Sequence, residues 1–311
     1  MFRKYFVFAL LFCSILSITS YSQKKSDEDK PVYIKANVMV LDSKDQLVSG
    51  IKPEDLKIYE DGVEQQITYF AEKRPILNLG IVVDNSGSMR PSLNEMTWAS
   101  SFVANNLRSD DSAFAVRFVS SDKIEVIQDW TPNRALLIEA FNNMFVEGGQ
   151  SAVLDAVYLS AQKLLERAEK DKTERYALLL ISDVEERDSY YKFDETIKLF
   201  NNTDSQLFIL SYAENAPSKK KYARKLSHLL SLETGGTIYT LDKKHTRDEL
   251  KNIVGKIIIE LRSNYVIGYK PTNQNRDDLP RKLTVQIADN ADGKKQTVLI
   301  RESYIVPKSK K

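Results

Sequence analysis

The chain has 311 residues, and its 45 Lys and Arg against 43 Asp and Glu give a formal net charge of +2. This near balance excludes a protein that binds nucleic acid mainly by neutralising phosphates, and the 42% of apolar residues excludes a disordered chain. One Cys excludes an internal disulfide or a Cys-rich zinc site, and two His leave little scope for histidine chemistry.

The first 22 residues have the pattern of a secretory signal peptide. A short basic segment precedes an almost unbroken apolar run from 5 to 18. Ser20 and Ser22 are small residues at the −3 and −1 positions of a cleavage site after residue 22. We therefore expect residues 1–22 to be removed on export, and the mature protein to be periplasmic or secreted.

Two alternatives remain for this segment. It can stay uncleaved as a membrane anchor, although its apolar run is shorter than the roughly 20 residues that a span needs. It can also be a lipoprotein signal that ends at Cys13, although Phe12 is large where such signals carry a small residue. No later stretch is apolar enough to span a membrane, and residues 23–30 indicate a polar linker.

Residues 31–73 form a predicted N-terminal β segment. Apolar residues alternate with other residues from 32 to 40, with the period of two that is typical of a strand. Asp61-Gly62 separates two strand-like runs, 56–60 and 63–70. This dipeptide predicts a hairpin, because both central residues of a type I′ turn need a positive φ.

From residue 74 to residue 262, short apolar runs alternate with stretches of helical periodicity. The apolar runs lie at 76–83, 113–119, 177–181 and 207–210. Runs without a polar face are typical of strands that are buried on both sides. The alternation predicts an α/β domain with a doubly wound, mostly parallel sheet and helices on both faces.

Two helix starts carry capping patterns. Thr131-Pro132 has the form of an N-cap followed by a proline at the first helical position. Thr246 and Glu249 have the spacing of a capping box, and an apolar stripe from 250 to 261 follows them.

The β pattern returns in residues 263–307, before a basic tail at 308–311. Strand-like runs lie at 265–269, 282–287 and 296–305. A turn at 290–293 predicts that the last two runs form a hairpin. Because each flank is too small to be stable alone, we expect both flanks to pair into one small β domain.

Oxygen-bearing side chains follow the apolar runs, where an open parallel sheet binds its ligands. Asp84, Ser86 and Ser88 alternate on one tight loop after the first run, so three oxygens can face one point. Ser151 precedes a helix, and Asp183 follows the third run. These are hard ligands, suited to Mg²⁺, Mn²⁺ or Ca²⁺.

Other interpretations of these residues are open. Ser86 or Ser88 can simply cap the next helix, and Asp183 can solvate a strand end. A serine hydrolase would need His228 or His245 as its base, and the sequence lacks the Gly-x-Ser-x-Gly elbow of that class. It also lacks the Gly-x-x-x-x-Gly-Lys loop of nucleotide hydrolases.

The run Asp84-Asn85-Ser86-Gly87-Ser88 resembles the metal-ion-dependent adhesion site of von Willebrand factor type A domains. Gly148-Gly149-Gln150-Ser151 resembles the loop with the family's Thr ligand, and Ser182-Asp183 resembles the strand end with its second Asp. The resemblance extends from about residue 75 to residue 262. In the flanks, the runs at 54–62 and 265–269 resemble the bacterial VWFA-related domain proteins.

The resemblance implies an exported, non-enzymatic binding protein with a divalent cation, Mg²⁺ above Mn²⁺ or Ca²⁺. Ser86, Ser88 and Ser151 would contact the ion directly. Asp84 and Asp183 would act directly or through water and would neutralise its charge. A carboxylate from a partner protein would fill the open coordination position. The alternative function is a scaffold or assembly subunit of a cell-envelope complex.

Two departures from the family pattern stand near these residues. Ser151 replaces the usual Thr and keeps the oxygen ligand. Val184 stands where the family often has Gly, and Glu185 and Glu186 follow it. Together with Glu147, these carboxylates are either solvated loop charges or groups that repel an acidic partner or occupy the open position.

Overall fold

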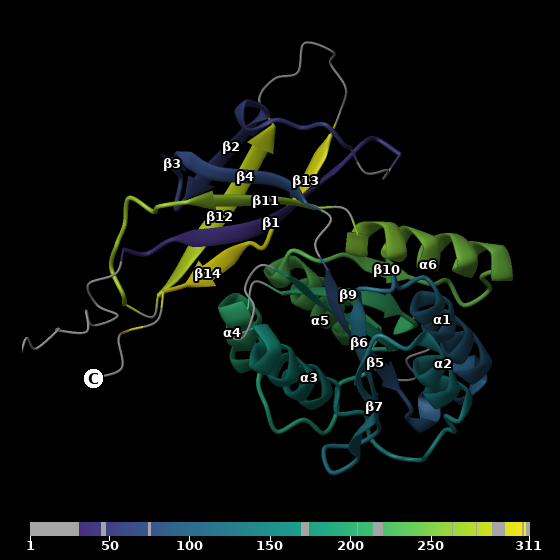
Figure 1. Ribbon diagram of the computed structural model, residues 1–311. Coiled ribbons are helices and arrows are strands. Elements are labelled where there is room, and N and C mark those ends of the chain that lie inside the picture. The colour runs from purple at the N-terminus through teal and green to yellow at the C-terminus, as the bar shows by residue number, and fades with distance from the viewer. Residues whose placement is uncertain are drawn as a thin grey trace, which may run out of the picture.

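Figure 1 shows a computed structural model of the protein. It describes residues 31–44, 48–73, 76–168, 174–203, 205–213, 220–262, 264–277, 279–287, 296–306 and 308. The predicted signal peptide, linker and turn at 290–293, and the basic tail beyond Lys308, lie outside these ranges. Within them, no helix combines the length and the apolar character that crossing a membrane requires.

A six-stranded sheet forms the centre of the larger part of the molecule, the α/β domain. Its order is β10-β9-β8-β5-β6-β7, and only β7 runs antiparallel to its neighbour. The strands are β5 (Leu77–Asp84), β6 (Ser112–Phe118), β7 (Ile124–Thr131), β8 (Arg175–Ser182), β9 (Gln206–Ser211) and β10 (Ile238–Thr240). Every residue of β5, β8 and β9 is buried, as the apolar runs predict.

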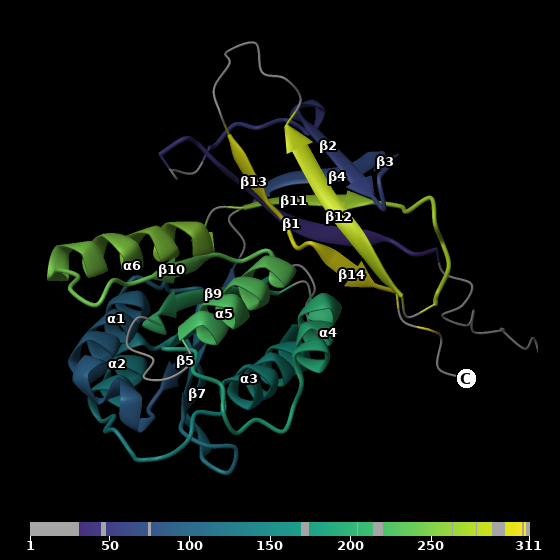
Figure 2. The ribbon, with the colours of Figure 1, turned by 180° about the vertical axis from the view of Figure 1, so that it is seen from behind.

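Helices cover both faces of this sheet (Figures 1 and 2). One face packs against α1 (Leu93–Asn105), α2 (Arg134–Asn142) and α6 (Arg247–Arg262). The other face packs against α3 (Val153–Ala168), α4 (Phe193–Thr203) and α5 (Lys220–Thr234). The predicted doubly wound α/β fold is therefore confirmed. The predicted capping box of α6 is also present, because Glu249 N donates to Thr246 Oγ1 at 3.2 Å.

The carboxyl end of β5 lies where the strand order reverses. The chain passes from β5 to β6 on one side and later returns to β8 on the other side of β5. This is the position at which doubly wound sheets bind ligands.

Two four-stranded sheets form a β-sandwich at the opposite, amino-terminal end of β5. Their orders are β13-β1-β11-β4 and β14-β12-β2-β3, and they share one apolar core. The strands are β1 (Ile34–Leu41), β2 (Leu56–Glu60), β3 (Val63–Gln65), β4 (Ile67–Lys73), β11 (Asn264–Tyr269), β12 (Pro280–Ile287), β13 (Thr297–Leu299) and β14 (Ser303–Ile305), with a 3₁₀ turn at Pro53–Asp55 before β2. Strands from both flanks of the chain therefore pair side by side (Figure 1).

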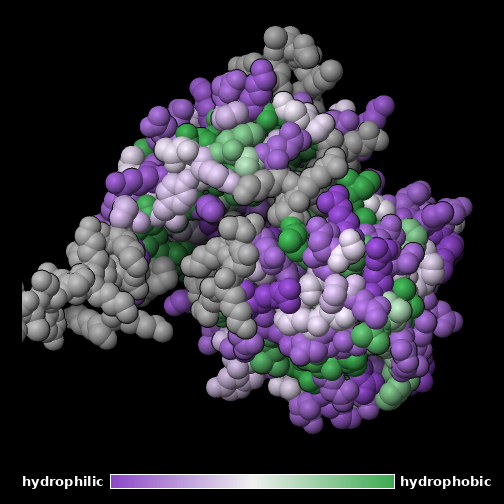
Figure 3. Space-filling model, in the orientation of Figure 1, coloured by the Kyte–Doolittle hydropathy of each residue, from purple (hydrophilic) through white to green (hydrophobic). Residues whose placement is uncertain are grey.

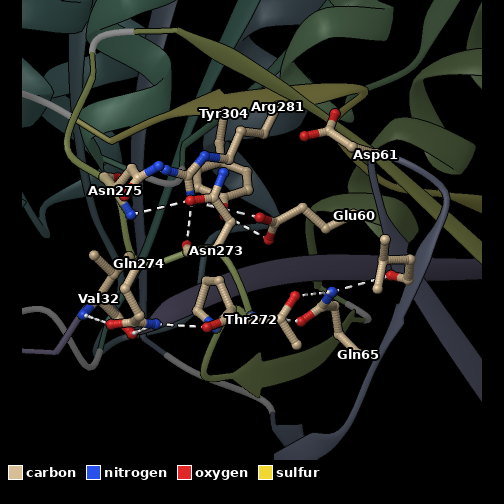
Figure 4. Close-up of polar contacts among 12 residues, drawn as sticks. Val32, Glu60, Asp61, Gln65, Thr272, Asn273, Gln274, Asn275, Arg281 and Tyr304 are labelled. Atoms are coloured by element: carbon tan, nitrogen blue, oxygen red, sulfur yellow. Dashed lines mark hydrogen bonds and ion pairs between the residues drawn. The ribbon is translucent and has the colours of Figure 1, made fainter.

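A buried ion pair lies inside the β-sandwich (Figure 4). Arg281 Nη1 is 3.4 Å from Glu60 Oε1, and both side chains are 2% exposed. The hydroxyls of Tyr269 and Tyr304 donate to Glu60 Oε2 at 2.9 and 2.6 Å. Arg281 also donates to two backbone carbonyls of the loop 270–279, so one guanidinium joins the sandwich core to this loop.

The flanking strands change sheets where the sequence predicts continuous pairing. The predicted strand 63–70 breaks at Gln66, so β3 pairs with β2 while β4 crosses to β11. The predicted hairpin of 282–287 with 296–305 is also wrong as one unit, because β14 pairs with β12 while β13 pairs with β1. In a sandwich, a long apolar run can serve both sheets by crossing between them. The Asp61-Gly62 turn is confirmed, with φ values of +49° and +81°.

The predicted helix start at Thr131-Pro132 is displaced. Thr131 is the last residue of β7, and the cap of α2 is Asn133, whose Oδ1 accepts from Ala135 N at 3.0 Å. A Thr before a Pro therefore ends a strand here, and the cap lies two residues later.

Candidate metal centre

Asp84 is the central acceptor at the end of β5. Its Oδ1 accepts from Ser86 N at 2.9 Å. Its Oδ2 accepts from Ser151 Oγ at 3.1 Å and from Ser182 Oγ at 2.6 Å. The side chain is fully buried. One carboxylate thus joins the loop after β5 and the last residue of β8 to the segment before α3.

The hydroxyls of Ser86 and Ser88 lie 3.1 Å apart on the loop after β5. Ser86 precedes the 3₁₀ helix Gly87–Ser92, but its side chain makes no capping hydrogen bond. The alternative in which Ser86 caps this helix is therefore wrong. The alternation of the two serines brings their oxygens together, as the sequence pattern predicts.

Asp183 follows β8 and is also fully buried. Its Oδ1 accepts from Glu185 N at 3.1 Å. Among the described residues, no hydrogen-bond partner is found for its Oδ2. A role in solvating the strand end does not fit a carboxylate with no exposed surface. A buried oxygen without a donor does fit a group that binds a cation.

The structure places all five predicted residues at one edge of the sheet. Ser182, to which the sequence assigns no role, belongs to the same group, because it donates to Asp84 and accepts from Val184 N at 2.8 Å. In the sequence, the only indication of this role is that Ser182 directly precedes Asp183. That Asp84, Ser86, Ser88, Ser151 and Asp183 ligate a metal stays a prediction.

Burial sets the electrostatics of the two aspartates. It raises the pKa of Asp84 above its ordinary value, while hydrogen bonds from Ser182 and Ser86 oppose this shift. Burial and the neighbouring charge of Asp84 raise the pKa of Asp183 to about 6. At neutral pH, two ionised carboxylates in this buried site would repel each other. A divalent cation would relieve that repulsion.

The donor set fits a hard cation. Within the described part of the chain, no three His, Cys, Asp or Glu side chains gather closely enough to hold a metal. The candidate centre instead combines two carboxylates with three hydroxyls, which are oxygen ligands of the type that Mg²⁺ and Ca²⁺ accept. The unpaired Oδ2 of Asp183 is consistent with this assignment.

The metal-free protein should lose stability as the pH rises from about 4 to about 6. Because folding raises the pKa of Asp183 from 3.8 to about 6, the native state binds more protons than the unfolded chain in this window. The loss should be on the order of 3 kcal/mol and complete above the folded pKa. Urea unfolding in chelator-treated buffer measures this loss of stability. In Asp183→Asn, the stability should change much less over the same pH range. Parallel pH profiles for the two proteins would contradict the assignment.

Two of the three glutamates beside the centre are not solvated loop charges. The carboxylate of Glu186 accepts from Leu154 N at 2.9 Å and so caps the start of α3. Glu185 has a side chain that is 2% exposed and lies 2.5 Å from Arg187 Nη2. Only Glu147 fits that interpretation in part, with 29% exposure and a distance of 4.0 Å to a lysine. Glu185 and Glu186 are thus engaged by other groups.

Val184 has a φ of +56°, a region that β-branched residues rarely adopt. Its side chain is nevertheless fully buried in the core that contains α3. This conformation gives a physical reason for glycine at the matching family position, because glycine adopts it without steric cost.

The Val184→Gly variant should be at least as stable to unfolding as the Val184→Ala variant. Both substitutions lose the buried side chain, but only Val184→Gly also removes a backbone strain of about 1 kcal/mol. Val157 in α3 is equally buried, but there the glycine variant should be about 1 kcal/mol less stable than the alanine variant. Urea denaturation of the four variants measures both differences. The same order at the two positions would rule out strain at Val184.

Comparisons with solved structures give weak similarities. The conserved hypothetical protein BatB from Bacteroides thetaiotaomicron is 14% identical, with a TM-score of 0.45 over 58% of this chain and 97% of that chain. An aerotolerance-related membrane protein from Bacteroides fragilis, with multiple mutations to serine, is 13% identical, with a TM-score of 0.43 over 58% and 98%. A von Willebrand factor type A protein from Catenulispora acidiphila is 11% identical, with a TM-score of 0.46 over 88% and 74%.

The family comparison concerns the segment that carries the candidate centre. No curated protein matches the chain. The sequence model described as "von Willebrand factor type A domain" matches residues 79–185, from β5 to the loop after β8. This range contains Asp84, Ser151 and Asp183 within the doubly wound sheet. Residues 79–185 of the chain therefore match the von Willebrand factor type A domain family.

Proposed function

We propose that this protein is an exported binding protein, whose metal-ion-dependent adhesion site recognises a carboxylate of a partner protein through a bound divalent cation. The observation that carries the proposal is the convergence of two buried aspartates and three serines at the carboxyl end of β5. Domains of this family commonly bind a divalent cation, and the match of residues 79–185 suggests protein–protein interaction.

The chain's own residues would divide the work by chemistry. Ser86, Ser88 and Ser151 would supply neutral hydroxyl oxygens, and Asp84 and Asp183 would supply the negative charge that keeps the cation in place. The cation, with Mg²⁺ the best candidate, supplies an electron-pair acceptor for an incoming carboxylate. Burial keeps water from screening the two aspartates, which strengthens their attraction for the ion.

The positions of the histidines favour binding over hydrolysis. His245 contacts the carbonyl of Asp242 at 2.7 Å and Glu95 Oε2 at 3.0 Å. His228 lies on α5 with an exposed side chain. Neither arrangement resembles a base that contacts Ser86 or Ser88, so we propose a non-enzymatic protein.

Export and the alternative role depend on the amino-terminal segment. Its signal-peptide pattern supports a periplasmic or secreted protein, and the same pattern is compatible with a scaffold subunit of a cell-envelope complex. The β-sandwich lies at the opposite end of the α/β domain from the centre, so it does not cover the centre's edge of the sheet in either role (Figure 1).

Capture of envelope or extracellular proteins on the immobilised chain tests the function. Binding in Mg²⁺ should be reversed by EDTA, lost in Asp84→Asn and kept in Asp111→Asn. Asp111 is an equally buried carboxylate that accepts from Leu77 N at 3.0 Å, at the amino-terminal end of β5. Captured proteins that stay bound in EDTA would favour the scaffold role. Capture that Asp84→Asn leaves unchanged would contradict an adhesion site.

A further inference from the structure

Two large aromatic side chains near the candidate centre are exposed. Phe145 is 54% exposed in the segment between α2 and Ser151, and Tyr190 is 77% exposed in the loop after Asp183. In the view of Figure 3, hydrophobic residues gather on the lower part of the α/β domain, away from the β-sandwich. An exposed ring indicates a contact surface only if its position is fixed, so the contacts that hold each ring matter.

Phe145 is held from the side of β6. The Asn85 side chain, between Asp84 and Ser86 in sequence, donates to the carbonyl of Phe145. The guanidinium of Arg117 on β6 lies 4.6 Å from the ring centroid, and Arg117 is paired with Glu125 at 2.8 Å. The backbone and one face of the ring are therefore fixed, while more than half of the side chain stays open to solvent.

Tyr190 is held by a carboxylate of α3. Asp155 Oδ2 accepts from Tyr190 N at 3.0 Å, and its Oδ1 accepts from Tyr191 N at 2.8 Å. Arg187 N, in the same loop, donates to Ser151 O at 2.9 Å. The ring packs edge-on against Tyr191, with centroids 5.4 Å apart. The loop is therefore tied to the segment that carries a predicted metal ligand.

Both rings are connected to the β6 side of the centre, because Ser121, in the turn after β6, donates to Asp155 Oδ2 at 2.5 Å, the oxygen that also accepts from Tyr190 N. Three charged groups around these loops already have partners. Arg117 pairs with Glu125, Arg187 pairs with Glu185, and Glu186 accepts amide hydrogens. Apolar aromatic surface is then what this rim offers to a partner, beside the single carboxylate position at the centre.

We propose that Phe145 and Tyr190 are the specificity-determining contact residues of the site, and that the partner presents one acidic side chain with apolar residues next to it. This inference rests on the proposed function. Rigid aromatic side chains lose little freedom on binding and often dominate the affinity of an interface. A segment rich in acidic residues would gain less, since the rim offers paired charges.

Two synthetic peptides test the inference on the full chain. One carries Gly-Asp-Gly and the other Leu-Asp-Leu, each between identical Ser-Gly ends. In Mg²⁺, the Leu-flanked peptide should bind about tenfold more tightly in NMR titrations. Phe145→Ala and Tyr190→Ala should each remove most of this advantage, while Leu136→Ala, an exposed residue on α2, should keep it.

The outcomes separate this inference from the function on which it rests. If neither peptide binds in Mg²⁺, both the adhesion site and its specificity are contradicted. If both peptides bind equally, or if the advantage persists in both alanine variants, only the specificity is contradicted. Unchanged Mg²⁺ affinity and melting temperature in the variants confirm that the fold and the centre are intact. Self-association that either alanine variant abolishes would instead assign the rim to a second copy of the chain.

Discussion

Replacement of Arg281 by methionine should lower the free energy of unfolding of the β-sandwich by about 3–5 kcal/mol. Methionine fills much of the same volume but removes the charge that faces Glu60 at 3.4 Å. It also leaves two carbonyls of the loop 270–279 without their donor. The tyrosine hydroxyls can still donate to Glu60, but they cannot compensate a buried negative charge.

Spectroscopy can separate the two parts of the molecule. Both tryptophans, Trp98 and Trp130, lie in the α/β domain, so their fluorescence follows that domain while far-UV circular dichroism follows the whole chain. The dichroism transition should move to lower urea. Lys282→Met, on the exposed face of the same strand, should change stability by less than about 0.5 kcal/mol. Equal effects of the two substitutions would show that the buried pair contributes nothing.

Asp84→Asn should weaken divalent-cation binding on the order of 100-fold or more. The substitution keeps the shape of the side chain and removes one of two buried charges that would attract the ion, in surroundings where charges are poorly screened. Because burial disfavours the ionised form of Asp84, the same variant should be no less stable than the wild type in metal-free buffer at neutral pH.

Calorimetric titration with Mg²⁺ and with Mn²⁺ measures the affinity. Asp111→Asn is the matched control, because it is the same chemical change at a buried carboxylate at the other end of the sheet. A loss of ion affinity as large in Asp111→Asn as in Asp84→Asn would mean that destabilisation, rather than a lost ligand, explains the result.

The buried centre of the α/β domain was predictable because its signals are local. β5 and β8 are continuous apolar runs, and a strand that is buried on both faces must have this composition. Once parallel order is inferred, residues directly after the strands share an edge. Asp84 and Asp183 could therefore be placed together although they are distant in sequence.

The edges and the crossings were less predictable. β7 pairs irregularly with β6 and has no fully apolar face, so neither strand pattern identifies it. Glu60 has the same parity as Ile58, and Arg281 the same parity as Leu283, which places both charges on the core face. A charged residue in a strand is normally assumed to face solvent, so only the tertiary pairing shows that the two neutralise each other.

The roles of Glu186 and Asp155 depend on contacts between segments about 30 residues apart. Each carboxylate accepts amide hydrogens from the other's segment, Glu186 from α3 and Asp155 from the loop after β8. In the sequence, Glu186 is one of several acidic residues after Asp183. Sequence periodicity does not show whether such a glutamate caps a helix of another segment or is a solvated charge.

Thermal unfolding of the wild-type chain in Mg²⁺ against EDTA tests the central claim most directly. At about 100 times its dissociation constant, an ion that binds only the folded state stabilises it by about 2.7 kcal/mol. We predict a clear increase in melting temperature in the wild type and a much smaller one in Asp84→Asn. No increase in the wild type, or an equal increase in the variant, would contradict a metal centre formed by these residues.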